Sequence, residues 1–105
     1  MSVHINFGRN VFAKPSFGVP QLMDARFGVT EAISAGAVTT IAALDTENGA
    51  HTIARVFNDT AATVYVSFNA VPDASTDANR IPVGAGLVEY FKVAVGDKAS
   101  VEAVV

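Results

Sequence analysis

The clearest alternation of apolar and polar residues lies in the second half of the chain. In residues 62–68, ATVYVSF, every second residue is apolar, and these side chains fall on one face of an extended strand. A period of two that is rich in β-branched and aromatic residues predicts a half-buried strand. Residues 98–105, KASVEAVV, alternate in the same way. We therefore expect Val66, Phe68 and Val101 to lie in a hydrophobic core.

Between these two strands, residues 87–95 (LVEYFKVAV) carry apolar side chains on both faces. A strand of this kind requires cover on both sides, which a second sheet or a neighbouring subunit can supply. Glycines before and after it predict tight turns. We expect Phe91 in the core, and we name Leu87, Tyr90 and Phe91 as candidate contacts with another subunit.

The middle of the chain favours three more strands. Residues 27–33 and 38–44 predict two of them, and residues 51–57 predict a strand that returns after the turn DTENG at 45–49. Asn-Gly in that turn is the strongest short-range hairpin signal. The alternative to the first two strands is one Ala-rich helix from Thr30 to Leu44, which a central glycine and a run of β-branched residues weaken.

Residues 1–26 predict an extended N-terminal arm ahead of a β-sandwich domain at residues 27–105. Two prolines and an irregular spacing of aromatic residues fit neither a helix nor a central strand. Phe7, Phe12 and Phe17 are too apolar to remain in water. We expect them either to fold back over the sheet of their own chain or to lie on a neighbour, and we name them as interface candidates.

Length and composition predict one all-β domain. A chain of 105 residues, half of them hydrophobic, has room for one core. The frequent turn signals favour a small antiparallel β-sandwich or a jelly-roll-like barrel with the extended arm attached. Only 16% of the residues are charged, against about 25% in typical soluble domains. This shortage indicates surface buried against other copies or a partner, the alternative being a plain surface of Thr, Ser and Asn.

Candidate chemistry is scarce. Without cysteine the chain forms neither a disulfide nor a thiolate site. His4 and His51 belong to no nucleophile motif, and we expect His51, next to the hairpin turn, at the surface. Asp73 and Asp77 do not match the spacing of a calcium loop, so we interpret them as solvated turn acids. We expect no catalytic residue, no cofactor and no metal site, and we do not expect an enzyme.

Charge and hydropathy exclude several classes of partner. A net charge of −3 argues against nucleic-acid binding, which needs a basic surface. The N-terminal sequence MSVHIN lacks the basic and apolar regions of a signal peptide. The uncharged runs are shorter than the roughly 18 residues of a membrane helix. We therefore expect neither secretion through a signal peptide nor a membrane segment.

Two segments resemble a known family. The sequences VYVSFNAVPDAS and RIPVGAGLVEYFKVAVGDKASVEAV resemble the C-terminal part of small virion structural proteins of tailed bacteriophages. The second segment matches the family pattern at Pro82, Gly84 or Gly86, Glu89, Phe91, Val93, Gly96, Asp97 and Lys98. The resemblance implies a capsid-associated or other virion role, and it implies no active site.

We therefore expect a non-enzymatic virion structural protein, most concretely a capsid-decorating or cementing subunit. Such a subunit is made in the host cytoplasm and binds further copies of itself and a capsid or other virion protein. It stabilises the shell by burying surface between copies. The alternative is a ligand- or carbohydrate-binding β-sandwich module of a phage fibre or receptor-binding assembly. Exposed tryptophan would favour that alternative, and the sequence has none.

Overall fold

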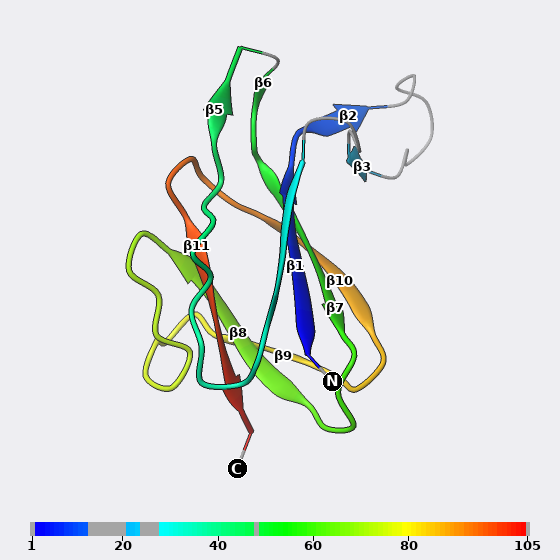
Figure 1. The fold of residues 1–105 in the computed structure, drawn as a ribbon, viewed down its shortest axis with the longest axis vertical. Coiled ribbons are helices and arrows are strands. Elements are labelled where there is room, and N and C mark those ends of the chain that lie inside the picture. Colours follow the sequence, from blue (N-terminus) through cyan, green and yellow to red (C-terminus); the bar gives the residue numbers. More distant parts are fainter. Residues whose placement is uncertain (1, 13–20, 24–27, 48, 105) are drawn as a thin grey trace.

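The computed structural model describes residues 2–12, 21–23, 28–47 and 49–104, and its two main sheets are antiparallel (Figure 1). The first sheet has the order β10 (Val88–Lys92), β7 (Ile53–Asn58), β1 (Val3–Gly8), β4 (Val29–Ile33). The second has the order β11 (Lys98–Ala103), β8 (Val64–Asn69), β9 (Ile81–Val83). Two short hairpins pair β2 (Asn10–Phe12) with β3 (Gln21–Met23) and β5 (Asp45–Thr46) with β6 (Gly49–Ala50). The described ranges contain no helix, and the predicted all-β, antiparallel class is confirmed.

The two larger sheets enclose one hydrophobic core. Val3, Ile5 and Phe7 alternate along β1 and are fully buried. Val66 on β8 and Val101 on β11 meet them from the other sheet, and both are fully buried as expected. Each apolar side chain removed from water in this way stabilises the fold by roughly 1.5–3 kcal/mol. The period of two in the sequence therefore identifies the inner faces correctly.

Phe68 and Phe91 lie at the rim of this core. Both are partly buried and pack against it. Their ring centroids are 5.4 Å apart, and Phe68 meets the edge of Phe7 at 6.2 Å. Aromatic contacts of this type contribute about 0.5–1.5 kcal/mol beyond burial of area. The two rings belong to the core, but at its open margin rather than at its centre.

The assignment of residues 1–26 to an arm apart from the sandwich is wrong for residues 3–8. These residues form β1, which lies inside the first sheet and pairs with β4 on one side and β7 on the other. Because the prolines occur only from Pro15 onward, every residue of β1 has an N–H to donate to a ladder. The sequence VHINF shows the period of two that the prediction overlooked. Residues 1, 13–20 and 24–26 of the predicted arm lie outside the described residues.

Residues 38–44 run beside β11 without becoming a regular strand, and the alternative helix does not form. Thr39 donates its backbone N–H to the Ala99 carbonyl at 2.8 Å, as a strand residue would. Its hydroxyl, however, accepts the Ala99 N–H at 3.0 Å and donates to the Ile41 carbonyl at 2.9 Å. A side chain thus takes the place of a backbone partner, which interrupts the ladder.

The strand predicted over residues 87–95 is shorter than expected. β10 ends at Lys92, and the chain then turns toward β11. The Asp97 carboxylate accepts the Ala94 N–H at 2.9 Å. Gly96 has a φ of 93°, a left-handed conformation that glycine adopts without a steric penalty. Local turn chemistry therefore stops a strand whose apolar pattern continues to Val95.

The DTENG turn forms the β5–β6 hairpin as expected, but the surface position predicted for His51 is wrong. His51 is only 1% exposed, because it lies at the base of the hairpin. Its ring Nδ1 accepts the backbone N–H of Leu44 at 3.1 Å, and the backbone N–H of His51 donates to the Leu44 carbonyl at 2.7 Å. The first bond requires that Nδ1 carry no proton. The imidazole closes the end of the core instead of facing solvent.

Asn58 fixes the start of β10 to the rest of the fold. It is fully buried at the end of β7, and its side-chain amide donates to the carbonyls of Ala62 at 2.8 Å and Val83 at 3.0 Å. Its backbone N–H donates to Leu87, and its carbonyl accepts from Gly86. The sequence predicts only a turn here, whereas the residue is a buried junction between β7, β9 and β10.

Candidate functional site

β10 forms an open edge of the four-stranded sheet, and apolar side chains are exposed along it. Leu87, immediately before the strand, is 52% exposed, and Tyr90 in its centre is 50% exposed. Val88 is also exposed, and so is Ile81 on β9, an edge strand of the other sheet. An exposed apolar edge strand presents unpaired backbone groups together with hydrophobic side chains, which makes it a template for pairing with another chain.

The interface candidates predicted from sequence are distributed unevenly. Leu87 and Tyr90 lie on the open edge, and Phe91 faces the core from the same strand. Phe7 is fully buried in its own chain, so its assignment to an interface between subunits is wrong. Phe12 belongs to β2, whose backbone alone is described, and Phe17 lies outside the described residues.

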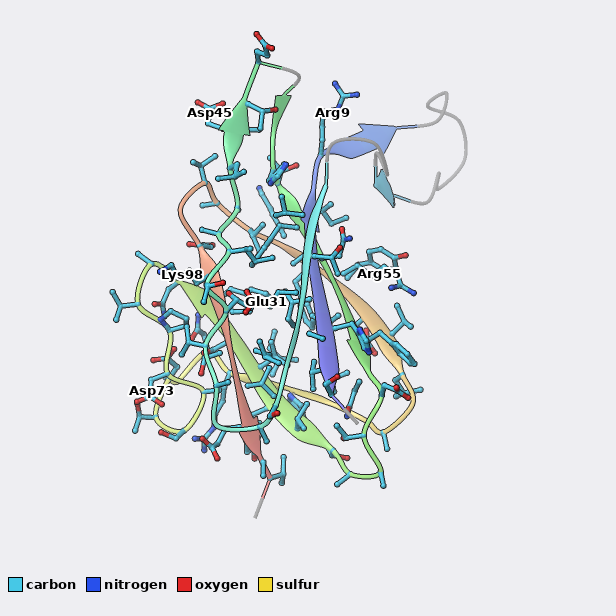
Figure 2. The ribbon with its side chains drawn as sticks, in the orientation of Figure 1. Arg9, Glu31, Asp45, Arg55, Asp73 and Lys98 are labelled. Carbon is cyan, nitrogen blue, oxygen red and sulfur yellow. The ribbon has the colours of Figure 1, made fainter. Side chains whose placement is uncertain are left out.

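The outer face of the first sheet carries mixed aromatic and polar groups. His4 stacks on Phe57 with ring centroids 5.7 Å apart, and its Nε2 lies 3.9 Å from the Asp59 carboxylate. Arg55 lies beside Tyr90 in the register of β7 and β10 and points away from the core (Figure 2). This face continues the exposed surface of β10 across the sheet.

At the opposite edge of the sheet, Glu31 of β4 closes the sandwich. One carboxylate oxygen accepts the N–H groups of Thr40 at 2.8 Å and Ile41 at 3.1 Å, and the Thr40 hydroxyl at 3.0 Å. Desolvation alone would raise the pKa of Glu31, but these hydrogen bonds outweigh it and hold the pKa below its ordinary value. The bonds attach the segment after β4 to the edge strand.

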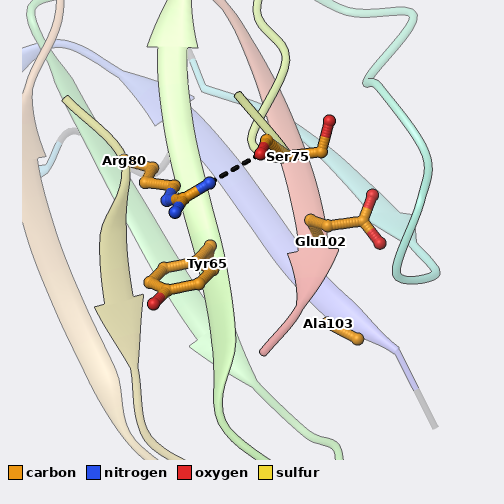
Figure 3. Close-up of a pocket in the computed structure, with 5 residues that line it drawn as sticks. All are labelled: Tyr65, Ser75, Arg80, Glu102 and Ala103. Carbon is orange, nitrogen blue, oxygen red and sulfur yellow. Dashed lines mark hydrogen bonds between the residues drawn. The ribbon is translucent and has the colours of Figure 1, made fainter. Parts of the chain in front are cut away.

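A pocket of about 350 Å³ with mixed polar and apolar lining lies on the outer face of the second sheet (Figure 3). Its lining residues are Tyr65, Ser75, Arg80, Glu102 and Ala103. The Arg80 guanidinium lies 4.5 Å from the centroid of the Tyr65 ring and donates to the Ser75 carbonyl at 2.6 Å. The lining thus contains one guanidinium and one carboxylate, which can bind a small polar ligand that both accepts and donates hydrogen bonds.

Sequence reasoning missed this pocket because its residues are far apart in the chain. Tyr65 and Glu102 are opposite each other in the register of β8 and β11, and Arg80 reaches them from the loop before β9. The only available signal was that Tyr65 and Glu102 fall on the polar face of two alternating strands. The pairing of those strands was needed to bring them together.

Asp73 and Asp77 have structural roles in the loop that follows β8. One oxygen of Asp77 accepts from the Ser67 hydroxyl at 2.9 Å, the Asn69 amide at 3.0 Å and the Asp73 N–H at 2.9 Å. The Asp73 N–H bond and then the Ser67 bond lower the pKa of Asp77, and bonds from Ser75 lower that of Asp73. Both acids lie in a loop, as predicted, but Asp77 also attaches this loop to β8 through its hydrogen bonds with Ser67 and Asn69.

Side chains that could ligate a metal are dispersed over the described ranges 2–12, 21–23, 28–47 and 49–104. No three His, Asp or Glu side chains within these ranges gather as a group able to hold a metal ion. The same part of the chain holds no helix that is long and apolar enough to cross a membrane. In comparisons with known proteins, no family model, curated protein or solved structure matches the chain. The open β10 edge and the pocket on the second sheet therefore stand as the two candidate sites on geometry alone.

Proposed function

We propose that the protein is a non-enzymatic structural subunit of a tailed-phage virion that decorates or cements the capsid by associating with further copies of itself and with a shell protein. The observation that carries the proposal is the open β10 edge, where exposed Leu87, Val88 and Tyr90 accompany unpaired backbone groups. The virion setting rests on the resemblance of residues 64–75 and 80–104 to small phage structural proteins.

The mechanism is mechanical. Pairing of an edge strand supplies directional backbone hydrogen bonds, and the apolar side chains beside it supply burial of surface. A charged fraction of 16% leaves few groups whose desolvation would oppose such burial. Copies joined in this way, and seated on a shell protein, add contacts between capsid subunits without any chemical step.

The first test is the mass of the purified protein in solution. Light scattering at micromolar concentrations should give a mass above that of the 10.9 kDa chain and rising with concentration. Sedimentation with tailed-phage particles then tests the capsid contact. A constant monomer mass, together with no sedimentation with particles, contradicts the proposal.

The second candidate function is binding of a small polar ligand, such as a sugar, in the pocket of Figure 3. It is favoured by the placement of Arg80 and Glu102 in one pocket beside Tyr65. Sugar hydroxyls can accept from the guanidinium and donate to the carboxylate. Titration with neutral oligosaccharides, followed by NMR, should shift signals of this pocket in the native protein and not in Arg80→Ala. The matched control is Arg55→Ala, on the other sheet.

A further inference from the structure

We propose that two copies associate by pairing their β10 strands antiparallel about a twofold axis at Tyr90, so that two four-stranded sheets become one continuous sheet. This inference rests on the proposed self-association and names its surface, its symmetry and its register. It follows from which backbone groups of β10 are already used and from where its charges lie.

The hydrogen bonds to β7 show which groups of β10 point outward. The Leu87 carbonyl accepts from the Asn58 N–H at 3.0 Å, and the Val93 N–H donates to the Thr52 carbonyl at 3.0 Å. The backbone N–H and C=O groups of the odd-numbered residues therefore point toward β7. Alternate residues of a strand direct their backbone groups to opposite sides. The N–H and C=O groups of Val88, Tyr90 and Lys92 therefore point away from the sheet. Within the described ranges, β7 is the only strand paired with β10, so these groups have no backbone partner there.

Charge excludes two of the five residues of β10 as the position of a twofold axis. An antiparallel pair of identical strands keeps outward groups facing each other only when the axis passes through a residue. An axis at Glu89 would place Glu89 opposite its own copy, and an axis at Lys92 would do the same for Lys92. Like charges directly opposite each other destabilise a strand pair.

Hydrogen bonds already present exclude two further positions. With an axis at Val88, Tyr90 would pair with Gly86 of the second copy. The N–H of Gly86 already donates to the Asn58 carbonyl of its own chain at 2.8 Å. With an axis at Phe91, Val88 would pair with Ala94 of the second copy. The N–H of Ala94 already donates to the Asp97 carboxylate of its own chain at 2.9 Å. Either axis would leave outward groups of β10 without a partner.

An axis at Tyr90 satisfies every outward group of the strand. Val88 then pairs with Lys92 of the second copy, Tyr90 pairs with its own copy, and each such pair exchanges two hydrogen bonds. Glu89 lies opposite Phe91 of the second copy, so no like charges are directly opposed. The two Tyr90 rings come side by side on the outer face, where each is half exposed in the single chain. An isologous contact of this kind closes on itself and forms a dimer rather than a fibre.

The absence of cysteine from the sequence makes this register directly testable by cross-linking. Tyr90→Cys places two thiols on Cα atoms about 5.5 Å apart in a hydrogen-bonded pair, within the roughly 4.4–6.8 Å that disulfides span. With oxidised glutathione as the oxidant, we expect a disulfide-linked dimer on a non-reducing gel. Val71→Cys is the matched control, because Val71 is 87% exposed and lies in a loop away from β10.

Two charge variants of Val88 test the same register without a covalent bond. Val88→Glu would face Lys92 of the second copy and tighten association, whereas Val88→Lys would face the same lysine and weaken it. Because the twofold axis repeats each contact, we expect the dissociation constant to change roughly two- to thirtyfold in each direction. Sedimentation equilibrium measures both changes.

The outcomes separate this inference from the proposed function. A native protein that associates, while Tyr90→Cys cross-links no better than Val71→Cys, overturns the β10 pair and leaves self-association standing. Cross-linking of Phe91→Cys in place of Tyr90→Cys overturns the register. A native protein that remains a monomer at all concentrations overturns both proposals.

Discussion

The two edge strands of the first sheet, β4 and β10, each carry a glutamate in the same cross-strand row, but the surroundings of the two carboxylates differ. Glu31 on β4 and Glu89 on β10 lie at the two ends of one cross-strand row, with Ile5 and Val56 between them on the inner face. A carboxylate at the margin of an inner face must either find hydrogen-bond partners or stay in contact with solvent. At β4 the carboxylate accepts hydrogen bonds from Thr40 and Ile41 of its own chain, whereas the Glu89 side chain at β10 is exposed.

The difference comes from the connection that follows each strand. After β4, Gly36 with a φ of 88° turns the chain toward the second sheet, and this brings Thr40 and Ile41 against Glu31. After β10, the turn closed by Asp97 carries the chain to β11 and leaves the edge uncovered. The loop, rather than the residue on the strand, therefore decides whether an edge is closed in its own chain.

Substitution of Asn58 should cause the largest loss of stability at either edge, because this residue attaches the open edge strand β10 to the rest of the fold. Asn58→Asp keeps the shape of the side chain but cannot donate to the carbonyls of Ala62 and Val83. Leaving these buried acceptors unsatisfied should lower the free energy of unfolding by roughly 2–4 kcal/mol. Urea denaturation measures the loss. The same substitution at exposed Asn79 is the control, and an equal effect at both positions would contradict the role of Asn58.

Glu31 and Glu89 form a matched pair for the next test. Glu31→Ala removes three hydrogen bonds, and because the carboxylate is partly exposed we expect a loss of only about 1 kcal/mol in unfolding free energy. Glu89→Ala removes an exposed group from the other end of the row and should change stability by less than about 0.5 kcal/mol. Denaturant midpoints of the two variants decide the matter, and the reverse ranking would show that β4 is not closed by Glu31.

The inner faces of the fold could be predicted because burial follows a period of two wherever one strand face meets the core. Val66 and Val101 are placed correctly by this rule, and VHINF obeys it as well. The error over β1 arose from letting Pro15 and Pro20 define the character of all residues before them. Proline restricts a strand only at its own position and its neighbours.

The edges, the junction and the pocket could not be predicted because they depend on which strands become neighbours. Nothing local to Asn58 distinguishes a buried junction from an exposed turn residue, and Thr39 ends a ladder only because Ala99 lies beside it. The pairing of Tyr65 with Glu102 likewise requires the register of β8 and β11. Of the interface candidates, Leu87 beside β10 and Tyr90 on it are exposed in the single chain, and their burial between subunits stays a prediction.

Acid should weaken the closed edge. The folded-state pKa of Glu31 lies below its unfolded value of about 4.3, so the folded chain holds this proton less readily than the unfolded chain. The contribution of Glu31 is therefore fully present above the unfolded pKa and is lost as the pH falls through the folded pKa. Glu31→Gln should reduce the slope of stability against pH over this window. Urea midpoints measured from neutral pH downward test this, and an unchanged slope would contradict it.

The smallest expected effect belongs to Glu89 at the open edge. In the β10 pair centred on Tyr90, the two Glu89 carboxylates are diagonal neighbours on the inner side, about 7–8 Å apart at the backbone. Both are exposed, so their repulsion is weak and screened by salt. Glu89→Gln should therefore tighten association by about 0.2–0.5 kcal/mol at low ionic strength, and added salt should remove most of the difference between the variant and the native protein. Sedimentation equilibrium at two salt concentrations measures this. Weaker association of Glu89→Gln would mean that the carboxylate contacts a positive group of the second copy, which the Tyr90 register does not provide.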